Sequence, residues 1–431
     1  MPKRSARENE LVEKAFRYMP GGSLGNVFQK KDEAFFISRG KGSRVWDVSG
    51  NEYIDYLLGS GPEFLGHAHP DIVAAVHKAL EDGFTFFHTN EAAVRLAEEI
   101  VKAVPCAEQV RFMSSGTEAD LQAMRIARAY RKRDKVLKFE GGYHGTSDYG
   151  WVSINNTVTP EFPNAAVPEA AGIPQAALDL VLVAPFNDLE TTTAIIEKHH
   201  DELACVIVEP VQRILAPVPG FLEGLREITA RYQIPLIFDE VVTGFRLAYG
   251  GAQEYYNVIP DLATYAKVVG GGLPLAVVAG RAEIMSVCDP QEVEKKDFVS
   301  MIGTLSGNPV AVAGGLAALE VLRRPGTYEK VRATGRKLMD ALERVFKQAE
   351  IPIVVSGVEA CFDVYFTDQP IRTYRDTLKA DAKMLGRYNA ALLKRGILKG
   401  GQKYYVGPCH TDRDVEQTIQ AFEEVAEELR G

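Results

Sequence analysis

Cysteine is scarce in this sequence, with five residues among 431 and no CxxC pair. An odd number of dispersed cysteines excludes the disulfide framework of a small secreted domain and provides no structural zinc site. The eight histidines form no HExxH motif, so we expect no bound metal. These absences favour an enzyme of the reduced cytoplasm.

An excess of basic residues is also missing, because 49 Lys and Arg stand against 58 Asp and Glu for a net charge of −9. Binding to nucleic acid or to an anionic membrane needs a basic face, so neither partner is expected. No apolar run approaches the roughly 18 residues of a transmembrane helix. The first residues are charged and lack the apolar core of a signal peptide.

The central part of the chain alternates helical patterns with short apolar strands. Single cores usually divide beyond about 250–300 residues, so this length predicts two domains. Alternating β and α units indicate an α/β fold with a mainly parallel sheet, whose strands are apolar because helices cover both faces. The expected strands are 109–113, 135–139, 180–183, 204–208, 236–239 and 276–279, and the expected helices are 71–82, 90–104, 118–133, 190–200, 222–233 and 308–323.

Both ends of the chain have a different pattern. A helix at 6–18 and a three-stranded meander at 34–38, 43–48 and 53–58 precede the central part, and an α+β region follows it. That region has predicted helices at 327–349, 374–395 and 413–429 and strands at 353–356 and 360–366. We expect these strands to join the meander in one small domain, which gives an N-terminal segment 1–58, a large domain 59–324 and a C-terminal part 325–431. The loop 152–176 has the length of a lid, a binding loop or a disordered segment.

Two glycine-containing segments follow predicted strands. In Ser115-Gly-Thr-Glu-Ala119, the uncapped N–H groups of a helix start suit a phosphate, although Ser115 and Glu118 also form a capping-box pattern. In Phe139-Glu-Gly-Gly-Tyr-His-Gly145, Tyr143 is placed to stack on a planar ligand, and a glycine-rich turn with a half-buried tyrosine is the alternative.

Two further segments carry a carboxylate and an amine. Asp239 ends an apolar strand, where ligands of open α/β sheets gather, and its partner is either a protonated ring nitrogen or Arg246 in a structural pair. Lys267 lies between uncharged residues and three glycines, and a desolvated lysine becomes a nucleophile able to form a Schiff base. Together the four segments supply what a pyridoxal phosphate site requires.

With these segments the chain resembles the class III (fold-type I) pyridoxal-phosphate-dependent aminotransferases, and among them glutamate-1-semialdehyde 2,1-aminomutase. The resemblance runs nearly end to end, through Pro20-Gly-Gly22, Arg39-Gly-Lys-Gly-Ser43, Trp46-Asp-Val48, Leu65-Gly-His-Ala-His-Pro70, the segments described above, Val208-Glu-Pro-Val211, Gly250-Gly-Ala-Gln253 and Gly303-Thr-Leu-Ser-Gly-Asn-Pro309. It implies a large domain with a mainly parallel seven-stranded sheet and a homodimer with shared active sites.

The resemblance also implies roles for individual residues. Lys267 would form the Schiff base and move the proton, and Asp239 would pair with the ring nitrogen of the cofactor. The other implied cofactor contacts are Ser115, Gly116 and Thr117 at the phosphate, Tyr143 and Val241 on the two ring faces, His144 and Glu209 near the ring, and Thr304 reaching the phosphate of the neighbouring subunit.

The chain departs from the aminomutase pattern in the expected substrate pocket. Phe28 stands where the aminomutase has a carboxylate-binding arginine, and Ser60 stands where it has a tryptophan. Phe cannot pair with a desolvated carboxylate. We expect an aromatic, largely uncharged pocket near Phe28, Phe86, Phe87 and His88, with Arg213 as the candidate for an acceptor carboxylate and a surface role for Arg213 as the alternative.

These observations predict a cytoplasmic aminotransferase that moves an amino group from an amine or amino acid to a keto acid by a ping-pong mechanism. The first alternative is the aminomutase, an isomerase that keeps the amine on one substrate. A racemase or lyase on the same scaffold is a second alternative, and a catalytically inactive binding protein is a third.

Overall fold

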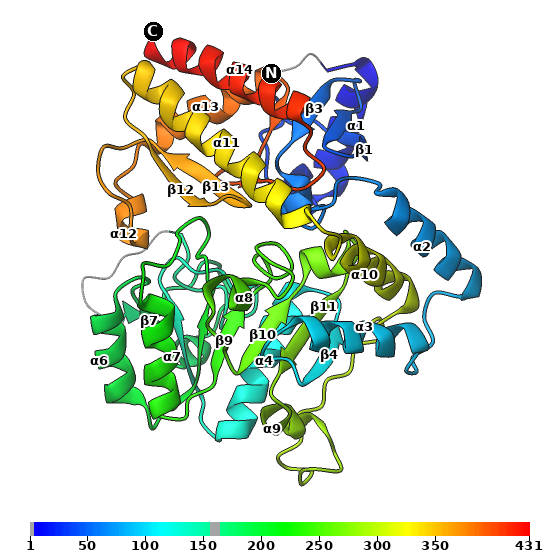
Figure 1. Ribbon diagram of the computed structural model, residues 1–431, viewed down its shortest axis with the longest axis vertical. Helices are drawn as coiled ribbons and strands as arrows, with labels where there is room; N and C mark the ends of the chain where they lie inside the picture. The colour runs from blue at the N-terminus through cyan, green and yellow to red at the C-terminus, as the bar shows by residue number, and fades with distance from the viewer. Residues whose placement is uncertain (1–3, 156–163) are drawn as a thin grey trace.

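The computed structural model describes residues 4–155 and 164–431 (Figure 1). Residues 156–163, which belong to the predicted long loop 152–176, lie outside the described residues. A hydrogen bond of 2.8 Å, donated by Ser153 N–H to Val167 O, joins the two parts of the chain that flank these residues.

An eight-stranded sheet forms the centre of the protein, in the order β4–β11–β10–β9–β8–β5–β7–β6. The strands are β4 (Gln109–Met113), β5 (Lys135–Phe139), β6 (Asn164–Ala165), β7 (Val181–Ala184), β8 (Leu203–Val208), β9 (Leu236–Asp239), β10 (Leu262–Tyr265) and β11 (Ala276–Gly280). The pairs β10–β9, β9–β8, β8–β5 and β5–β7 are parallel, whereas β11 is antiparallel to both of its neighbours. The predicted mainly parallel sheet is confirmed, with the two-residue β6 as an additional antiparallel edge.

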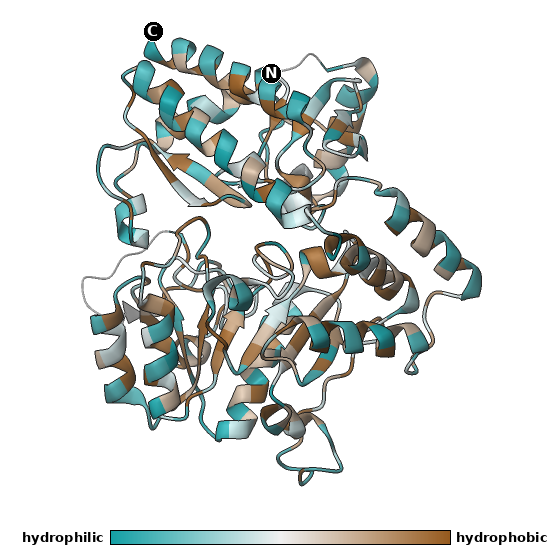
Figure 2. Cartoon of the chain, viewed as in Figure 1, coloured by the Kyte–Doolittle hydropathy of each residue, from teal (hydrophilic) through white to brown (hydrophobic). Residues whose placement is uncertain are grey.

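The sheet has a hydrophobic core on each face. All six residues of β8 are buried, and the last four alternate between the two cores: Val206 and Val208 contribute to one, Cys205 and Ile207 to the other. Helices α4 (Gly116–Arg131) and α9 (Ala282–Met285) pack into the second core. Helices α3 (Glu91–Ala103), α6 (Leu189–His199), α7 (Phe221–Arg231) and α10 (Pro309–Leu322) pack into the first. In Figure 2 the strands of this sheet are mostly brown, as expected of a layer covered on both sides.

Short helices complete this part of the chain. They are α2 (Pro70–Asp82), α5 (Gln175–Leu178), α8 (Ala252–Tyr256), and the 3₁₀ turns η2 (Leu58–Ser60), η3 (Lys267–Gly270) and η4 (Ser286–Cys288). Because β5, β8, β9 and β10 are parallel, the segments that follow them all leave the sheet at its carboxyl edge. Elements from the C-terminal part reach this edge, where Arg375 Nε pairs with Glu140 Oε2 at 2.8 Å and Ser356 Oγ donates to Ile214 O.

The two ends of the chain meet in a second sheet, of order β1–β2–β3–β14. It consists of β1 (Ile37–Lys41), β2 (Arg44–Asp47), β3 (Glu52–Asp55) and β14 (Ile397–Leu398), and β14 runs parallel to β3. The N-terminal elements α1 (Ala6–Tyr18) and η1 (Pro20–Gly22) precede it.

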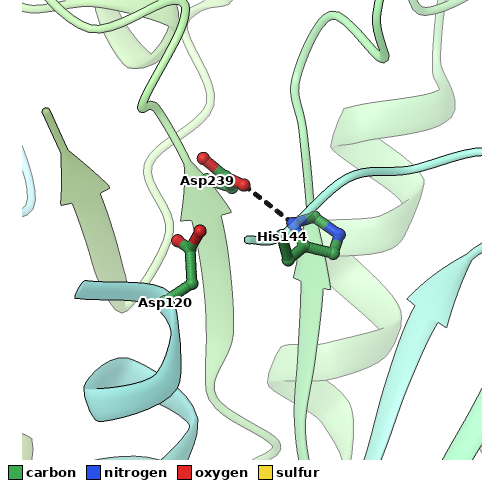
Figure 3. A group of neighbouring side chains, drawn as sticks. All are labelled: Asp120, His144 and Asp239. Atoms are coloured by element: carbon green, nitrogen blue, oxygen red, sulfur yellow. Dashed lines mark hydrogen bonds and ion pairs between the residues drawn. The ribbon is translucent and has the colours of Figure 1, made fainter. Parts of the chain in front are cut away.

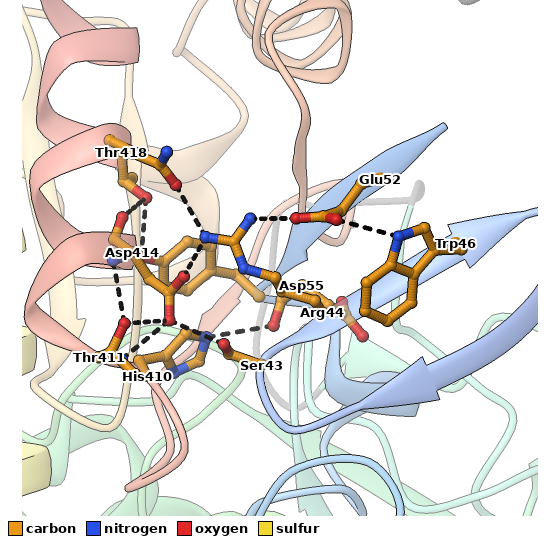
Figure 4. Close-up of polar contacts among 11 residues, drawn as sticks. Ser43, Arg44, Trp46, Glu52, Asp55, His410, Thr411, Asp414 and Thr418 are labelled. Atoms are coloured by element: carbon orange, nitrogen blue, oxygen red, sulfur yellow. Dashed lines mark hydrogen bonds and ion pairs between the residues drawn. The ribbon is translucent and has the colours of Figure 1, made fainter. Parts of the chain in front are cut away.

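A buried carboxylate ties these ends together (Figure 4). Asp414, in the first turn of α14 (Asp412–Arg430), accepts hydrogen bonds from Ser43 Oγ and Thr411 and pairs with Arg44 at 2.6 Å. Burial on its own raises the pKa of Asp414, but the hydrogen bonds from Thr411 and Ser43 and the charge of Arg44 outweigh it and lower the pKa. The Asp414 contacts therefore cap a helix and join it to β2 at the same time.

The C-terminal strands β12 (Val354–Val358) and β13 (Cys361–Tyr365) pair with each other and with β15 (Tyr404–Tyr405) in a third sheet. Our expectation that they join the N-terminal meander is wrong, since β14 is the one C-terminal strand of the described residues that pairs with it. Helices α11 (Thr327–Gln348), α13 (Ala382–Lys394) and α14 lie beside these sheets, with α11 packed against α14 (Figure 1). The division at residues 58 and 324 stays a prediction.

Three local predictions differ from the structure. The helix expected over 374–395 is two helices, α12 (Tyr374–Thr377) and α13, because the Asp381 carboxylate caps the second one by accepting from Lys383 N and Met384 N. The strand expected at 34–38 begins at Ile37 and extends to Lys41. The strand Leu262–Tyr265, just before Lys267, was not expected from the residue pattern.

All five cysteines are free, and four of them are buried. Within residues 4–155 and 164–431, no helix is both long and apolar enough to span a lipid bilayer.

Candidate active site

Close backbone approaches at glycines bring the predicted motif segments together at the carboxyl edge of the sheet. A side-chain carbon on Gly116 would lie 3.1 Å from Val241 Cγ1 and 3.6 Å from Ala266 Cβ, so the segments carrying Ser115, Asp239 and Lys267 converge there. A carbon on Gly145 would lie 2.6 Å from Thr117 Cα, and Gly145 has a φ of +76°, which favours glycine. The segment that carries Tyr143 and His144 therefore packs directly against the start of α4.

The start of α4 has two free donors. Ser115 caps the helix, accepting from Glu118 N at 3.3 Å, while Glu118 Oε2 accepts from Ser115 N at 3.0 Å, so the capping-box reading is correct. The N–H groups of Gly116 and Thr117 have no acceptor in the part of the chain that the structure describes. Capping and anion binding are thus compatible here, because the box leaves the first two helical N–H groups unpaired.

A buried carboxylate–imidazole pair stands at the end of β9 (Figure 3). Asp239 Oδ2 lies 2.8 Å from His144 Nδ1, and Asp239 Oδ1 accepts from Val241 N at 3.0 Å. Both side chains are at most 4% exposed. His144 Nε2 is buried without a hydrogen-bond partner among the described residues.

Asp120, which the sequence did not single out, completes a group of three. It lies on α4, accepts a hydrogen bond of 2.6 Å from Thr264 Oγ1, and has ligand atoms within 4.8 Å of those of His144 and Asp239 (Figure 3). Burial, and then the charge of Asp239, raise the pKa of Asp120 well above its usual range. An acidic residue on the otherwise apolar buried face of a predicted helix was the available signal.

The three side chains also have the composition of a metal site. The hydrogen bond between His144 Nδ1 and Asp239 Oδ2 places a proton between the two closest donor atoms, which suits a proton-holding cluster better than a cation.

Lys267 stands opposite this group, at the start of η3, with a φ of +52°. Its amine makes no hydrogen bond or ion pair within residues 4–155 and 164–431. Burial, reinforced by the charge of Lys403, lowers the pKa of Lys267 to about 8, against the opposing charge of Asp239. The unprotonated amine is therefore a minor form at neutral pH and about half of the population near pH 8.

Arg246 is not the partner of Asp239, although the sequence allowed it. Its guanidinium donates to the carbonyl oxygens of Val242 and Gly61 and lies 4.8 Å from the ring centroids of both Phe64 and Tyr405. The Asp239 carboxylate consequently keeps its free face for another cation.

Glu209 links Tyr143 to Arg213. One of its oxygens accepts from Tyr143 N at 2.6 Å and the other from Arg213 N at 2.9 Å. The Arg213 guanidinium lies 5.7 Å from the Tyr143 ring centroid and forms no ion pair with any described residue. Arg213 therefore offers an unpaired cation beside the predicted stacking ring.

The predicted aromatic pocket is not assembled around Lys267 in a single chain. Phe28, Phe86 and Phe87 are 74%, 52% and 66% exposed, and His88 and Ser60 are exposed as well. Thr304 is exposed between Ile302 and Leu305, two apolar side chains that also face solvent. Among the described residues none of these side chains has a hydrogen bond or ring contact with the Lys267 site.

The fold and the site together combine an α/β sheet with a helix start that has free N–H groups, a strand-end carboxylate and a buried amine. Residues 27–404 match the family described as aminotransferase class-III, and the chain belongs to this family.

Solved structures agree with this assignment. An omega-transaminase from Sphaerobacter thermophilus is 36% identical with a TM-score of 0.95, over 100% of this chain and 99% of that one. A β-phenylalanine aminotransferase from Variovorax paradoxus is 29% identical with a TM-score of 0.86, over 97% and 93%. A glutamate-1-semialdehyde aminomutase from Pseudomonas aeruginosa PAO1 is 24% identical with a TM-score of 0.85, over 98% and 94%, which shows a shared fold.

Family membership confirms the predicted fold, the class of enzyme and its cofactor, pyridoxal phosphate. The residues of this chain fit that cofactor. The free N–H groups of Gly116 and Thr117 suit its phosphate, the Asp239 carboxylate suits its protonated ring nitrogen, and the unpaired Lys267 amine suits its aldehyde.

Replacement of Gly145 by alanine should weaken cofactor binding. The new methyl group would force the chain away from Thr117, and overpacking of this kind costs about 1–3 kcal/mol, or roughly five- to 150-fold in affinity. The dissociation constant of the cofactor, measured by absorbance titration of apo-protein, gives the result.

Gly172→Ala is the matched control, because Gly172 has a φ of +96° but nothing within 4 Å of the added carbon. Equal effects of the two substitutions would show that backbone strain, rather than the approach to Thr117, matters.

Proposed function

We propose that this class III aminotransferase works by a ping-pong mechanism in which Lys267 holds the cofactor through its amine. The observation that carries the proposal is the unpaired Lys267 amine with a lowered pKa, on the same sheet edge as Asp239 and the free donors of α4. The donor is an amine or an amino acid, and the acceptor is a keto acid that arrives after the first product has left.

Each residue around Lys267 has a separate task in this mechanism. The backbone N–H groups of Gly116 and Thr117, with the Ser115 hydroxyl, bind the phosphate. Tyr143 and Val241 flank the ring, and Asp239 holds the proton on the ring nitrogen. When bound, pyridoxal phosphate supplies an electron sink that makes the Cα–H bond of the donor acidic.

Lys267 also moves the proton. With the cofactor bound, the Lys267 amine would act as the base that takes the proton from the donor Cα, and a pKa of about 8 suits a base that works near neutral pH. His144 and Glu209 act around it: His144 orients the Asp239 carboxylate, and Glu209 holds Tyr143 and Arg213 in place through their backbone N–H groups.

The aminomutase is the second candidate, because a protein of that name shares the fold. The substitution of Phe28 for a carboxylate-binding arginine disfavours it, since the charge of the semialdehyde substrate would lack that partner. Arg213, whose guanidinium is unpaired in the described structure, is our candidate for the carboxylate of a keto-acid acceptor. The exposed Phe28, Phe86 and Phe87 favour a donor with an aromatic or apolar group, consistent with the aromatic β-amino acid named for one relative.

We further propose a homodimer in which Thr304 reaches the phosphate site of the partner. The supporting observation is that Ile302 and Leu305, 81% and 54% exposed, flank Thr304 on an apolar surface. Burial of this surface and of the exposed phenylalanines in a dimer would build the substrate pocket that one chain leaves open. The free, mostly buried cysteines are consistent with a reduced, cytoplasmic setting.

The two halves of the reaction should be separable. Incubation of the cofactor-loaded protein with one amine donor and no keto acid should bleach its long-wavelength absorbance with one equivalent of product per subunit, and a keto acid should restore the absorbance. Lys267→Ala should do neither. Turnover of glutamate-1-semialdehyde without any keto acid would instead identify the aminomutase, and no response to any amine would contradict amino transfer.

Capture of the cofactor by apo-protein should follow the protonation of Lys267. The rate should rise with pH and level off above about 8, because only the unprotonated amine attacks the aldehyde. Lys403→Met removes a charge that lowers this pKa, so the midpoint should move to higher pH, as stopped-flow absorbance would record. Lys347→Met, at an exposed position on α11, serves as the control, and an unchanged midpoint in Lys403→Met would contradict the assigned cause.

Ile302→Asp should convert the dimer to a monomer with weakened cofactor binding, because a carboxylate cannot be buried unpaired in an apolar interface. Sedimentation and absorbance titration measure the two effects. Ile259→Asp, at another isoleucine that is 51% exposed, should change neither. A variant at Ile302 that remains dimeric would place the interface elsewhere.

A further inference from the structure

The buried group of Asp120, His144 and Asp239 contains two carboxylates and one imidazole with donor and acceptor atoms within 4.8 Å (Figure 3). Asp120 and Asp239 are 2% and 4% exposed, so water screens their charges poorly. Two carboxylates this close do not both ionise without a large cost, and one of them retains its proton.

The hydrogen bonds decide which carboxylate keeps the charge. Asp239 has two donors, the backbone N–H of Val241 at 3.0 Å and His144 Nδ1 at 2.8 Å. Asp120 has one, the neutral hydroxyl of Thr264 at 2.6 Å. Since each donor stabilises an anion, the charge resides on Asp239.

Other charged groups that face Asp120 do not reverse this assignment. Lys267, from η3, favours ionisation, whereas Asp239 at the end of β9 and Glu209 just after β8 oppose it. Burial is the largest effect, and the overall direction is a raised pKa.

We propose that Asp120 is a positioning residue that remains a neutral acid in the folded protein and thereby confines the negative charge of the buried group to Asp239. A single anion then faces the protonated ring nitrogen of the cofactor, with His144 bonded to its other side. The role of Asp120 towards the cofactor rests on the proposed pairing of Asp239 with the ring nitrogen. The protonation of Asp120 itself does not depend on that pairing.

The first experiment uses the pH dependence of stability. An aspartate protonated when folded and ionised when unfolded takes up a proton on folding, so its contribution is fully present below the unfolded pKa of about 3.9 and is lost as the pH rises towards the folded pKa. Asp120→Asn cannot ionise, and its side-chain oxygen still accepts from Thr264. The folding equilibrium constant of this variant relative to the parent should therefore rise about tenfold per pH unit between pH 5 and 7, measured by urea unfolding without added cofactor.

Asp261→Asn is the matched control, because Asp261 is also buried but its charge is paired with Arg226 at 2.7 Å and Arg281 at 3.2 Å. The folding equilibrium constant of Asp261→Asn relative to the parent should stay below one and should not change between pH 5 and 7. A ratio for Asp120→Asn that does not rise between pH 5 and 7 would overturn the proposal.

The second experiment compares how Asp120 and Asp239 contribute to cofactor binding. At neutral pH Asp120→Asn should keep the cofactor affinity within about threefold, since the amide resembles the neutral acid, whereas Asp239→Asn should lose about a hundredfold or more. These dissociation constants come from absorbance titration of apo-protein. An Asp239→Asn variant with normal affinity would refute the proposed cofactor pairing and leave the result on Asp120 intact, whereas a large loss in Asp120→Asn would show that Asp120 carries charge.

Discussion

The candidate site depends on one constraint: buried parallel strands end at a common edge, and the side chains proposed for the chemistry follow strands that end there. Asp239 is the last residue of β9, Glu209 follows β8, His144 lies six residues from Lys138 in β5, and Lys267 follows β10. The strands are fixed by burial on both faces, so the positions of these side chains are set by the hydrophobic core rather than by contacts among themselves. Glycines at 116 and 145 then allow the helix start to approach closely enough to present its N–H groups.

The electrostatic balance of the site follows from the same burial. Desolvation disfavours every charge, so each buried charged group needs a neighbour that stabilises it. His144 and the backbone N–H of Val241 stabilise Asp239, whereas Asp239 stabilises the charge of Lys267 only in part. The result is a lysine with a lowered pKa and an acid with a raised one in the same buried site, and burial is the largest cause of both shifts. Such opposing shifts are typical of sites that transfer protons.

Much of this arrangement was predictable from the sequence, and what was not has identifiable physical reasons. Asp239, Lys267 and the Ser115 capping box lie beside strands and glycines in short segments whose local pattern is distinctive. Asp120 was missed because helical periodicity predicts that a residue is buried but not which side chains meet it across the sheet. The break at Asp381 depends on a capping hydrogen bond within a continuous helical pattern. The predicted pocket residues Phe28, Phe86 and Phe87 are exposed in the single chain, and their sequence pattern carries no signal of what covers them.

The junction between the chain ends has a consequence for how the protein is made. Ser43 and Asp414 are 371 positions apart, and β3 receives its parallel partner β14 only near the end of the chain. During synthesis the N-terminal strands must therefore wait, with an unpaired edge, until almost the whole polypeptide has left the ribosome. The central sheet is complete long before that, since its last strand ends at Gly280. An unpaired strand edge can pair with another chain, so this N-terminal segment is open to aggregation during synthesis.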